Sequence, residues 1–144
     1  MSVLLDTHVW LWWMLGSERL PAAQRIALDR LASRRGLRLA AVSLWEAQML
    51  HSKGRLELDR PFDTWVREAA AAEVIELAPL DVEVAIALDR LPASFHGDPA
   101  DRLIVATARA QGWSLATQDR AIRRSRTVKL WRPRESRSTV PKPA

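Results

Sequence analysis

Cysteine is absent from this chain of 144 residues, and no apolar run in it is long. Without cysteine the protein cannot form disulfides, zinc–thiolate sites or a thiol nucleophile. No apolar run reaches the roughly 18 residues that a membrane span requires, and the first residues lack the basic start and small-residue cleavage site of a secretory signal. We therefore expect a cytoplasmic location.

Glycine is scarce as well, with five residues in the whole chain. None of them belongs to a P-loop, a G-x-G-x-x-G turn or a G-x-S-x-G elbow. Nucleotide-loop chemistry and a serine nucleophile therefore lack support. What remains is an ordinary composition, 48% hydrophobic and 27% charged, which fits one globular domain.

Positive charge is in excess, with 22 Lys and Arg against 17 Asp and Glu, a net charge of +5. If several acids are drawn into one site, the remaining surface is more positive still. This balance favours a polyanionic partner such as nucleic acid. Arg123, Arg124 and Arg126 are the best candidates for phosphate contacts, although a solvated helix face would have the same composition.

Short apolar runs alternate with stretches of helical spacing along the chain. Strands are expected at 2–5, 37–42, 74–77, 114–117 and 128–131, and helices at 8–15, 20–31, 43–51, 59–70, 82–88, 98–111 and 119–125. Such alternation predicts an α/β fold with a mainly parallel central sheet of four to five strands. We expect one domain over residues 1–131 and a flexible basic tail over 132–144.

Four acids follow the strands of this predicted sheet. Asp6 comes directly after the first strand, and Asp119 comes just after the fourth. Glu46 lies one turn into the helix after the second strand, and Asp101 lies one turn into the helix that begins at Asp98-Pro99. Because ligands of open α/β sheets bind beyond the carboxyl ends of the strands, we expect these acids to gather at one edge.

Each acid also has a structural explanation, because helix starts favour acids. Ser43 and Glu46 have the spacing of a capping box, in which Glu46 would bond back to the Ser43 amide. Asp98-Pro99 is a typical N-cap followed by proline at the first helical position, and Asp101 suits the positive first turn. Two further pairs are cap candidates: Asp6 or Thr7, and Thr117 or Asp119.

Capping alone gives no reason for acids to share one edge of a sheet. Carboxylates about 4 Å apart repel by roughly 4 kcal/mol per pair at an effective dielectric near 20, so a cluster needs shared protons, raised pKa values or a bound cation. Oxygen ligands without His or Cys suit Mg²⁺ or Mn²⁺. Beside a basic surface, such a site favours phosphodiester hydrolysis, with Glu46 or Asp119 orienting the water.

Four blocks of sequence resemble one known family. They are LLDTHVW at 4–10, VSLWE at 42–46, HGDPADRLIVATA at 96–108 and LATQD at 115–119. In order and spacing they resemble the PIN domain and, more narrowly, the VapC-type toxins of bacterial type II toxin–antitoxin pairs. The resemblance extends from residue 2 to about residue 131.

This resemblance implies a compact three-layer α/β/α fold and an Mg²⁺- or Mn²⁺-dependent endoribonuclease that acts on RNA. It also implies a homodimer and a cognate antitoxin that blocks the site. The acidic quartet of the family falls on Asp6, Glu46, Asp101 and Asp119, with Asp6 and Asp101 as the principal metal ligands. Asp98 is a cap, a residue that hydrogen-bonds a ligand from behind, or an auxiliary ligand. Three hydroxyl side chains would hydrogen-bond the carboxylates or act as caps: Thr7, Ser43 and Thr117.

Three other readings stay open at this point. An aspartyl-phosphate phosphatase or receiver-like domain also has an Asp after its first strand, but would add a paired acid and a lysine after a later strand, whereas Lys129 lies within an expected strand. A non-catalytic nucleic-acid-binding or interaction module would use the acids only as caps. A nuclease for structured DNA would share the whole site. His8 and His96 lack a metal-binding spacing, so we expect ordinary packing or surface roles for them.

Overall fold

A four-stranded, all-parallel sheet forms the centre of the structure, a computed structural model that describes residues 1–95 and 97–133. The strands are β1 (Val3–Leu5), β2 (Leu37–Ala40), β3 (Glu76–Ala78) and β4 (Ser114–Ala116), in the order β3-β2-β1-β4. The expected α/β class with a parallel sheet is confirmed.

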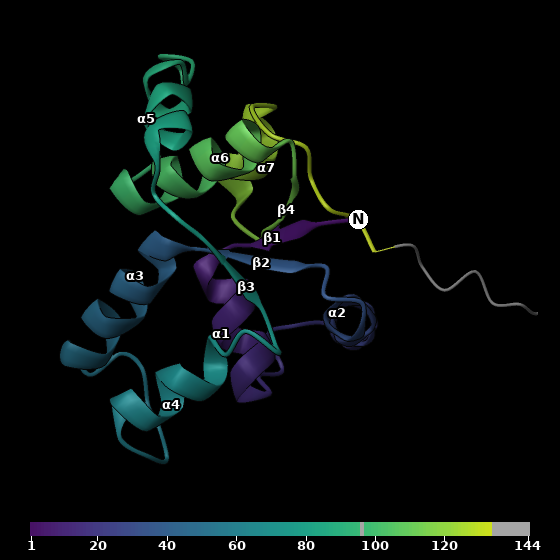
Figure 1. Cartoon of the computed structure of the whole chain (residues 1–144), viewed down its shortest axis with the longest axis vertical. Helices are drawn as coiled ribbons and strands as arrows, with labels where there is room; N and C mark the ends of the chain where they lie inside the picture. The colour runs from purple at the N-terminus through teal and green to yellow at the C-terminus, as the bar shows by residue number, and fades with distance from the viewer. Residues whose placement is uncertain (96, 134–144) are drawn as a thin grey trace, which may run out of the picture.

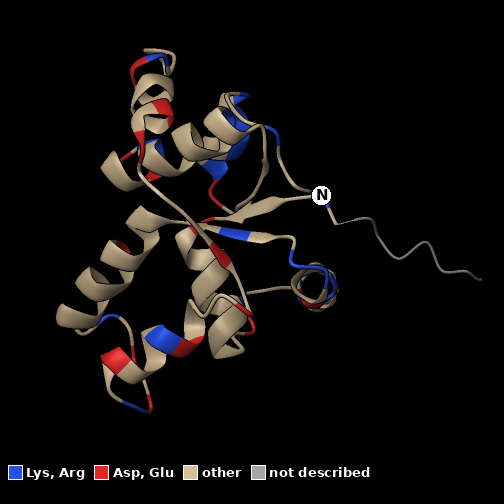
Figure 2. Cartoon of the chain, in the orientation of Figure 1, with Lys and Arg blue, Asp and Glu red and all other residues tan. Residues whose placement is uncertain are grey.

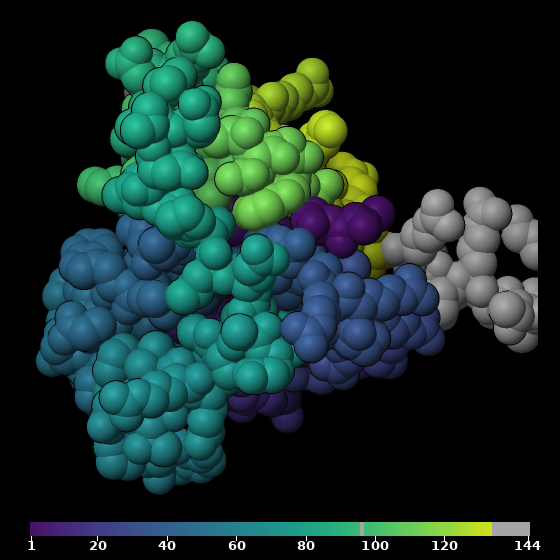
Figure 3. Space-filling view, in the orientation of Figure 1, coloured from purple at the N-terminus to yellow at the C-terminus, as the bar shows by residue number. Residues whose placement is uncertain are grey.

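Helices cover both faces of this sheet. They are α1 (Thr7–Leu15), α2 (Ala22–Ser33), α3 (Ala41–Ser52), α4 (Phe62–Ala69), α5 (Val82–Asp89), α6 (Pro99–Gln111) and α7 (Arg120–Ser125). Figure 1 shows α5, α6 and α7 on one side and α1 to α4 on the other, the expected three layers. In Figure 3 the two helical layers pack closely, with the purple N-terminal residues visible between them. Among the described residues no helix combines the length and apolar character needed to cross a membrane.

The central strand β1 is buried on both faces. Val3 and Leu5 face one core, which also contains Trp10, and Leu4 faces the other, which also contains Ile104. All three strand residues are fully buried, as expected for a parallel strand between two helical layers. The short run Val3-Leu4-Leu5 is apolar at every position for this reason, and the polar residue that follows it marks the strand's end.

The carboxyl ends of three strands lie level with one another. In the register of the sheet, Leu5 of β1 lies opposite Leu39 of β2 and opposite Ala116 of β4. The chain passes from β1 to β2 and β3 on one side and adds β4 on the other. The direction in which the chain adds strands therefore reverses between β1 and β4. The carboxyl ends of these two paired strands form the topological switch point, where open α/β sheets bind their ligands.

The expected fifth strand at 128–131 is wrong. This segment forms a single parallel bridge between Leu130 and Leu115, with one hydrogen bond on each side of it. Helix α7 ends at Arg126 in a left-handed conformation with φ 55°, and the chain then meets a β4 that is only three residues long. Of the expected tail at 132–144, only residues 132 and 133 lie within the described range.

Candidate active site

Asp6 occupies the switch point between β1 and β4. As the N-cap of α1, it accepts a hydrogen bond at Oδ1 from the Thr7 amide at 2.7 Å. Its Oδ2 accepts a second bond from the Thr117 hydroxyl, also at 2.7 Å. Asp6 is only 4% exposed, and this burial raises its pKa above the ordinary value despite the hydrogen bonds and the charge of His8, which lower it. A buried acid is thus held firmly at the edge of the sheet.

Glu46 does not cap its helix, so the capping-box interpretation is wrong. Helix α3 begins at Ala41 with Ala40 as its N-cap and no side-chain cap, which places Ser43 inside the helix rather than before it. The Glu46 carboxylate instead accepts a hydrogen bond at Oε1 from the Thr7 hydroxyl of α1, at 2.6 Å. Glu46 therefore makes a hydrogen bond between α3 and α1 and not a bond to the start of its own helix.

A short chain of hydroxyl groups supports Glu46. The Thr7 Oγ1 lies 2.8 Å from the Ser43 Oγ, and all three side chains are buried. Because the Thr7 hydroxyl has one hydrogen and gives it to Glu46, the Ser43 hydroxyl must be the donor to Thr7. Two of the three hydroxyl groups expected near the acids therefore serve Glu46, and the third, Thr117, serves Asp6.

Asp119 and Asp98 both act as N-caps. Asp119 caps α7 through the Ile122 amide at 2.9 Å, and its own amide donates to the Thr117 hydroxyl at 3.0 Å. Asp98 caps α6 through the Asp101 amide at 2.8 Å. These bonds fix Asp119 beside Thr117, which also donates to Asp6. They fix Asp98 at the start of α6, one turn before Asp101.

Asp101 is partly buried and lies near the other acids. Burial is the largest cause that raises the pKa of Asp101 to about 7, and the negative charges of four neighbouring acids add to it. Those neighbours are Asp98, Asp6, Asp119 and Glu46. Burial likewise raises the pKa of Glu46, with Asp6 and Asp98 contributing. The acids expected to gather at one edge therefore lie close enough to act on one another.

A tight approach beside Asp101 was not anticipated from the sequence. A Cβ atom on Gly97 would lie 2.9 Å from the Phe95 ring and 3.0 Å from the Asp101 Cβ, so glycine lets the buried Phe95 pass close to the acid. The Arg102 guanidinium donates to the Phe95 carbonyl at 2.9 Å and holds this segment. The signal in the sequence was a glycine directly before the Asp98 cap. His96, between Phe95 and Gly97, lies outside the described residues.

The donor set suits a hard divalent cation. The side chains that gather here offer carboxylate oxygens, and three of them have raised pKa values, which a nearby cation would lower. Within residues 1–95 and 97–133, no three His, Asp or Glu side chains already stand together as ligands of one ion. Mg²⁺ usually keeps several waters and takes one or two carboxylates plus substrate phosphates, so facing acids without a closed cage are compatible with it.

Comparison with known proteins agrees with the geometry. A family model described as the PIN domain matches residues 3–127. The chain is 38% identical over 133 residues to Ribonuclease VapC22 of Mycobacterium tuberculosis, a match that covers 90% of this chain and 98% of that protein.

Two solved structures share the fold at lower identity. VapBC2 from Rickettsia felis, bound to a DNA fragment from its promoter, matches with a TM-score of 0.70 and 17% identity over 91% of this chain and 98% of the other. DNA-bound VapBC from Salmonella typhimurium matches with a TM-score of 0.71 and 18% identity over 91% and 97%. The matched model over residues 3–127 and the relative of 38% identity together show that this chain belongs to the PIN domain family.

Proposed function

We propose that this protein is an Mg²⁺- or Mn²⁺-dependent endoribonuclease, the toxin of a type II toxin–antitoxin pair. The observation that carries the proposal is the group of acids at the switch point, where burial, with the charges of the neighbouring acids adding to it, raises the pKa of Asp101 to about 7. The relative of 38% identity is named a ribonuclease, and the net charge of +5 suits a polyanionic substrate.

Asp6 and Asp101 are the proposed principal metal ligands. The Asp101 carboxylate receives no hydrogen bond from the described residues, so both of its oxygens are available to a cation. The Asp6 carboxylate is fixed by two donors but has about four lone-pair positions. Asp119 and Asp98 support the site from its rim. A divalent ion bound here would polarise the phosphate and lower the pKa of bound water.

Glu46 is the proposed acceptor of the proton from the attacking water. Its Oε1 is held by Thr7, whereas its Oε2 accepts no hydrogen bond from the described residues. Burial raises its pKa, which makes it a stronger proton acceptor than an ordinary carboxylate. Asp119 is less suitable because its Oδ1 is engaged in capping α7. In the reaction the water oxygen bonds to phosphorus, one of its protons passes to Glu46, the bond from phosphorus to the leaving strand breaks, and the leaving oxygen takes up a proton from solvent.

A homodimer and a cognate antitoxin belong to the same proposal. The solved structures of similar fold contain VapBC pairs. This chain also carries exposed apolar side chains that a protein partner can bury, including Trp45 on α3 at 54% exposure and Val82 on α5 at 72%. Exposed apolar surface of this kind is typical of interaction sites.

Cleavage of labelled single-stranded RNA and of flap DNA, with Mn²⁺ and with EDTA, tests the proposal. We expect RNA to be cut only with metal, and Asp6→Asn to lower the rate by roughly 100-fold or more, since a lost 2.7 kcal/mol of transition-state stabilisation is about 100-fold. Asparagine is as good an N-cap as aspartate, so circular dichroism should show an intact fold.

Asp63→Asn is the matched control, because Asp63 also lies in a first helical turn but is exposed and remote from the acids. It should leave cleavage unchanged. Preference for flap DNA would instead assign the site to structured DNA. RNA binding without any metal-dependent cleavage would make the chain a non-catalytic module.

A further inference from the structure

Positive charge is concentrated in about the last quarter of the described chain. Residues 102–133 contain eight Lys and Arg and one acid, Asp119, whereas residues 1–101 contain 11 Lys and Arg and 15 acids. Figure 2 shows this as blue on α7 and the segment after it. The basic character of the protein is therefore a property of one region and not of the whole surface.

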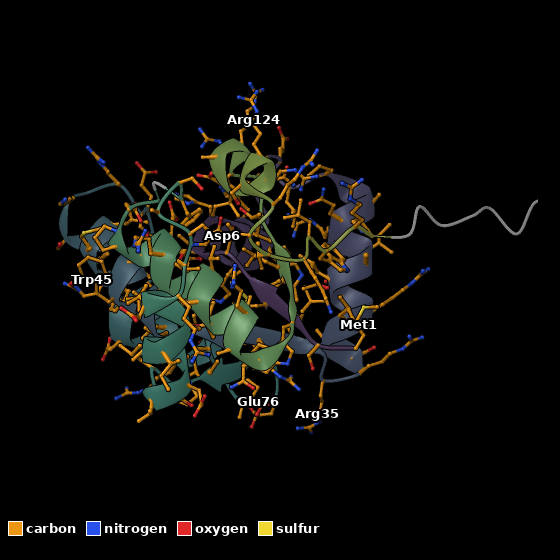
Figure 4. All side chains as sticks on the ribbon, turned by 90° about the horizontal axis from the view of Figure 1, so that it is seen from above. Met1, Asp6, Arg35, Trp45, Glu76 and Arg124 are labelled. Atoms are coloured by element: carbon orange, nitrogen blue, oxygen red, sulfur yellow. The ribbon has the colours of Figure 1, made fainter. Side chains whose placement is uncertain are left out.

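This region begins at the candidate site. Helix α7 starts directly after Asp119, and four exposed arginines lie on it and at its end, here called the α7 basic face: Arg120, Arg123, Arg124 and Arg126. The Arg123 guanidinium donates to the Thr117 carbonyl at 3.1 Å, and the Thr117 hydroxyl donates to Asp6. In Figure 4 the Arg124 side chain points away from the domain, on the far side of α7 from Asp6. The face thus extends from the rim of the site outward.

Folding accounts for only part of this face: Arg123 and Arg124 lie in the last turn of α7, where cations are favourable, and Arg123 bonds to the Thr117 carbonyl. The ion pairs found among the described residues involve Arg38, Arg60 and Arg67 and none of the α7 basic face. Cations near a helix C-terminus are favourable, but Arg120 is the first residue of α7, where a cation opposes the helix dipole. Arg126 adopts a left-handed conformation with φ 55°, which is unusual for a residue other than glycine. The positions of Arg120 and Arg126 are therefore not explained by ion pairs or by the helix dipole.

We propose that the α7 basic face binds the backbone phosphates of single-stranded RNA as the strand leaves the acidic site. This inference rests on the proposed function for the location of the scissile bond. A single strand is favoured over a duplex because Asp6 is 4% exposed and a flexible strand can bend to bring its phosphate to a recessed carboxylate. Arginines recognise phosphate through paired N–H donors, and such contacts carry affinity without reading sequence.

The expected size of the effect follows from counterion release. Each phosphate contact to a single strand contributes about 0.7 to the slope of log affinity against log salt concentration. Each contact therefore makes the RNA affinity about fivefold higher at 0.1 M salt than at 1 M salt. Replacing Arg120 and Arg124 together should therefore weaken RNA binding by about 25-fold and reduce the slope by about 1.4.

The test measures fluorescence anisotropy of a labelled 12-nucleotide RNA in EDTA at several salt concentrations. The full chain with Arg120→Gln and Arg124→Gln is compared with wild type and with a matched control, Arg19→Gln with Arg90→Gln. Both control arginines are exposed and lie among acids, beside Glu18 and Asp89. The control loses the same net charge, so we expect it to keep the wild-type slope and affinity within about twofold.

Equal losses in the two double variants, or no change in the α7 variant, would overturn the proposal. Tighter binding of duplex DNA than of RNA, with the same dependence on α7, would overturn it in favour of a duplex ligand. Because binding is measured without metal, it is independent of cleavage. If wild type binds RNA through α7 but does not cut it with Mn²⁺, the proposed function fails and this inference stands.

Discussion

Replacing Asp101 by asparagine should stabilise the metal-free protein at pH 8 and abolish metal-dependent cleavage. The pKa of Asp101 is raised from 3.8 to about 7 by burial and by neighbouring acids. Above pH 4 the unfolded chain therefore releases a proton that the folded protein retains. The free energy of unfolding falls as the pH rises from about 4 to about 7, and above that range the full penalty remains. Asparagine has no such proton to lose.

The magnitude follows from the size of the shift. A difference of about three pKa units corresponds to roughly 4 kcal/mol, but Asp101 is partly exposed, so solvent screening reduces this to about 2 kcal/mol. Loss of a negative charge in the first turn of α6 costs about 0.5 kcal/mol. The net gain of about 1.5 kcal/mol should raise Tm by roughly 5 °C for a domain of this size.

Thermal unfolding in EDTA at pH 4.5 and at pH 8 measures the effect. We expect Asp101→Asn to melt above wild type at pH 8 and close to it at pH 4.5, and Mn²⁺ to raise the Tm of wild type alone, because a cation that binds only the folded state stabilises it. Asp63→Asn, in the first turn of α4, should lose a little stability at both pH values. A lower Tm of Asp101→Asn at pH 8, or a difference that does not depend on pH, would refute the reasoning.

Two further substitutions probe the surroundings of the acids. Thr7→Val removes the hydrogen bond that lowers the pKa of Glu46, so the acidic limb of the pH–rate profile should move to higher pH. Thr7→Ser, which keeps the hydroxyl, should restore the wild-type profile, and identical profiles for all three proteins would contradict the assigned contact. Gly97→Ala places a Cβ atom 3.0 Å from that of Asp101 and should weaken Mn²⁺ binding roughly 10-fold. Isothermal titration checks this, and unchanged affinity would show that the Phe95 segment adapts freely.

The position of Asp6 and Asp119 could be inferred from the sequence because it depends on local rules. A three-residue apolar run in a chain of alternating helices and strands is a buried parallel strand, and the residue after it lies at the carboxyl edge. The same local logic predicted the Asp98 cap and the end of the following helix at residue 111, which the structure confirms. Covalent neighbours and backbone geometry determine each of these features.

Ser43 and Glu46 show where local rules fail. Their spacing matches a capping box, but α3 starts two residues earlier. Both side chains instead contact Thr7, which is 36 residues from Ser43. No pattern within one helix can reveal a partner on another. The approach of Phe95 to Asp101 past Gly97 was missed for the same reason, since it depends on how one segment packs against α6.

Capping and metal binding are usually weighed as alternatives for acids at helix starts, but here the same residues can do both. Asp6, Asp98 and Asp119 cap α1, α6 and α7, and each cap contributes only about 1 kcal/mol. Carboxylates about 4 Å apart would repel by roughly 4 kcal/mol per pair, so caps hold the side chains in place without neutralising them. Asp101 caps no helix, and burial, with the negative charges of the neighbouring acids adding to it, raises its pKa to about 7. A divalent cation relieves that repulsion for the whole group, and the caps keep its ligands in position before it arrives.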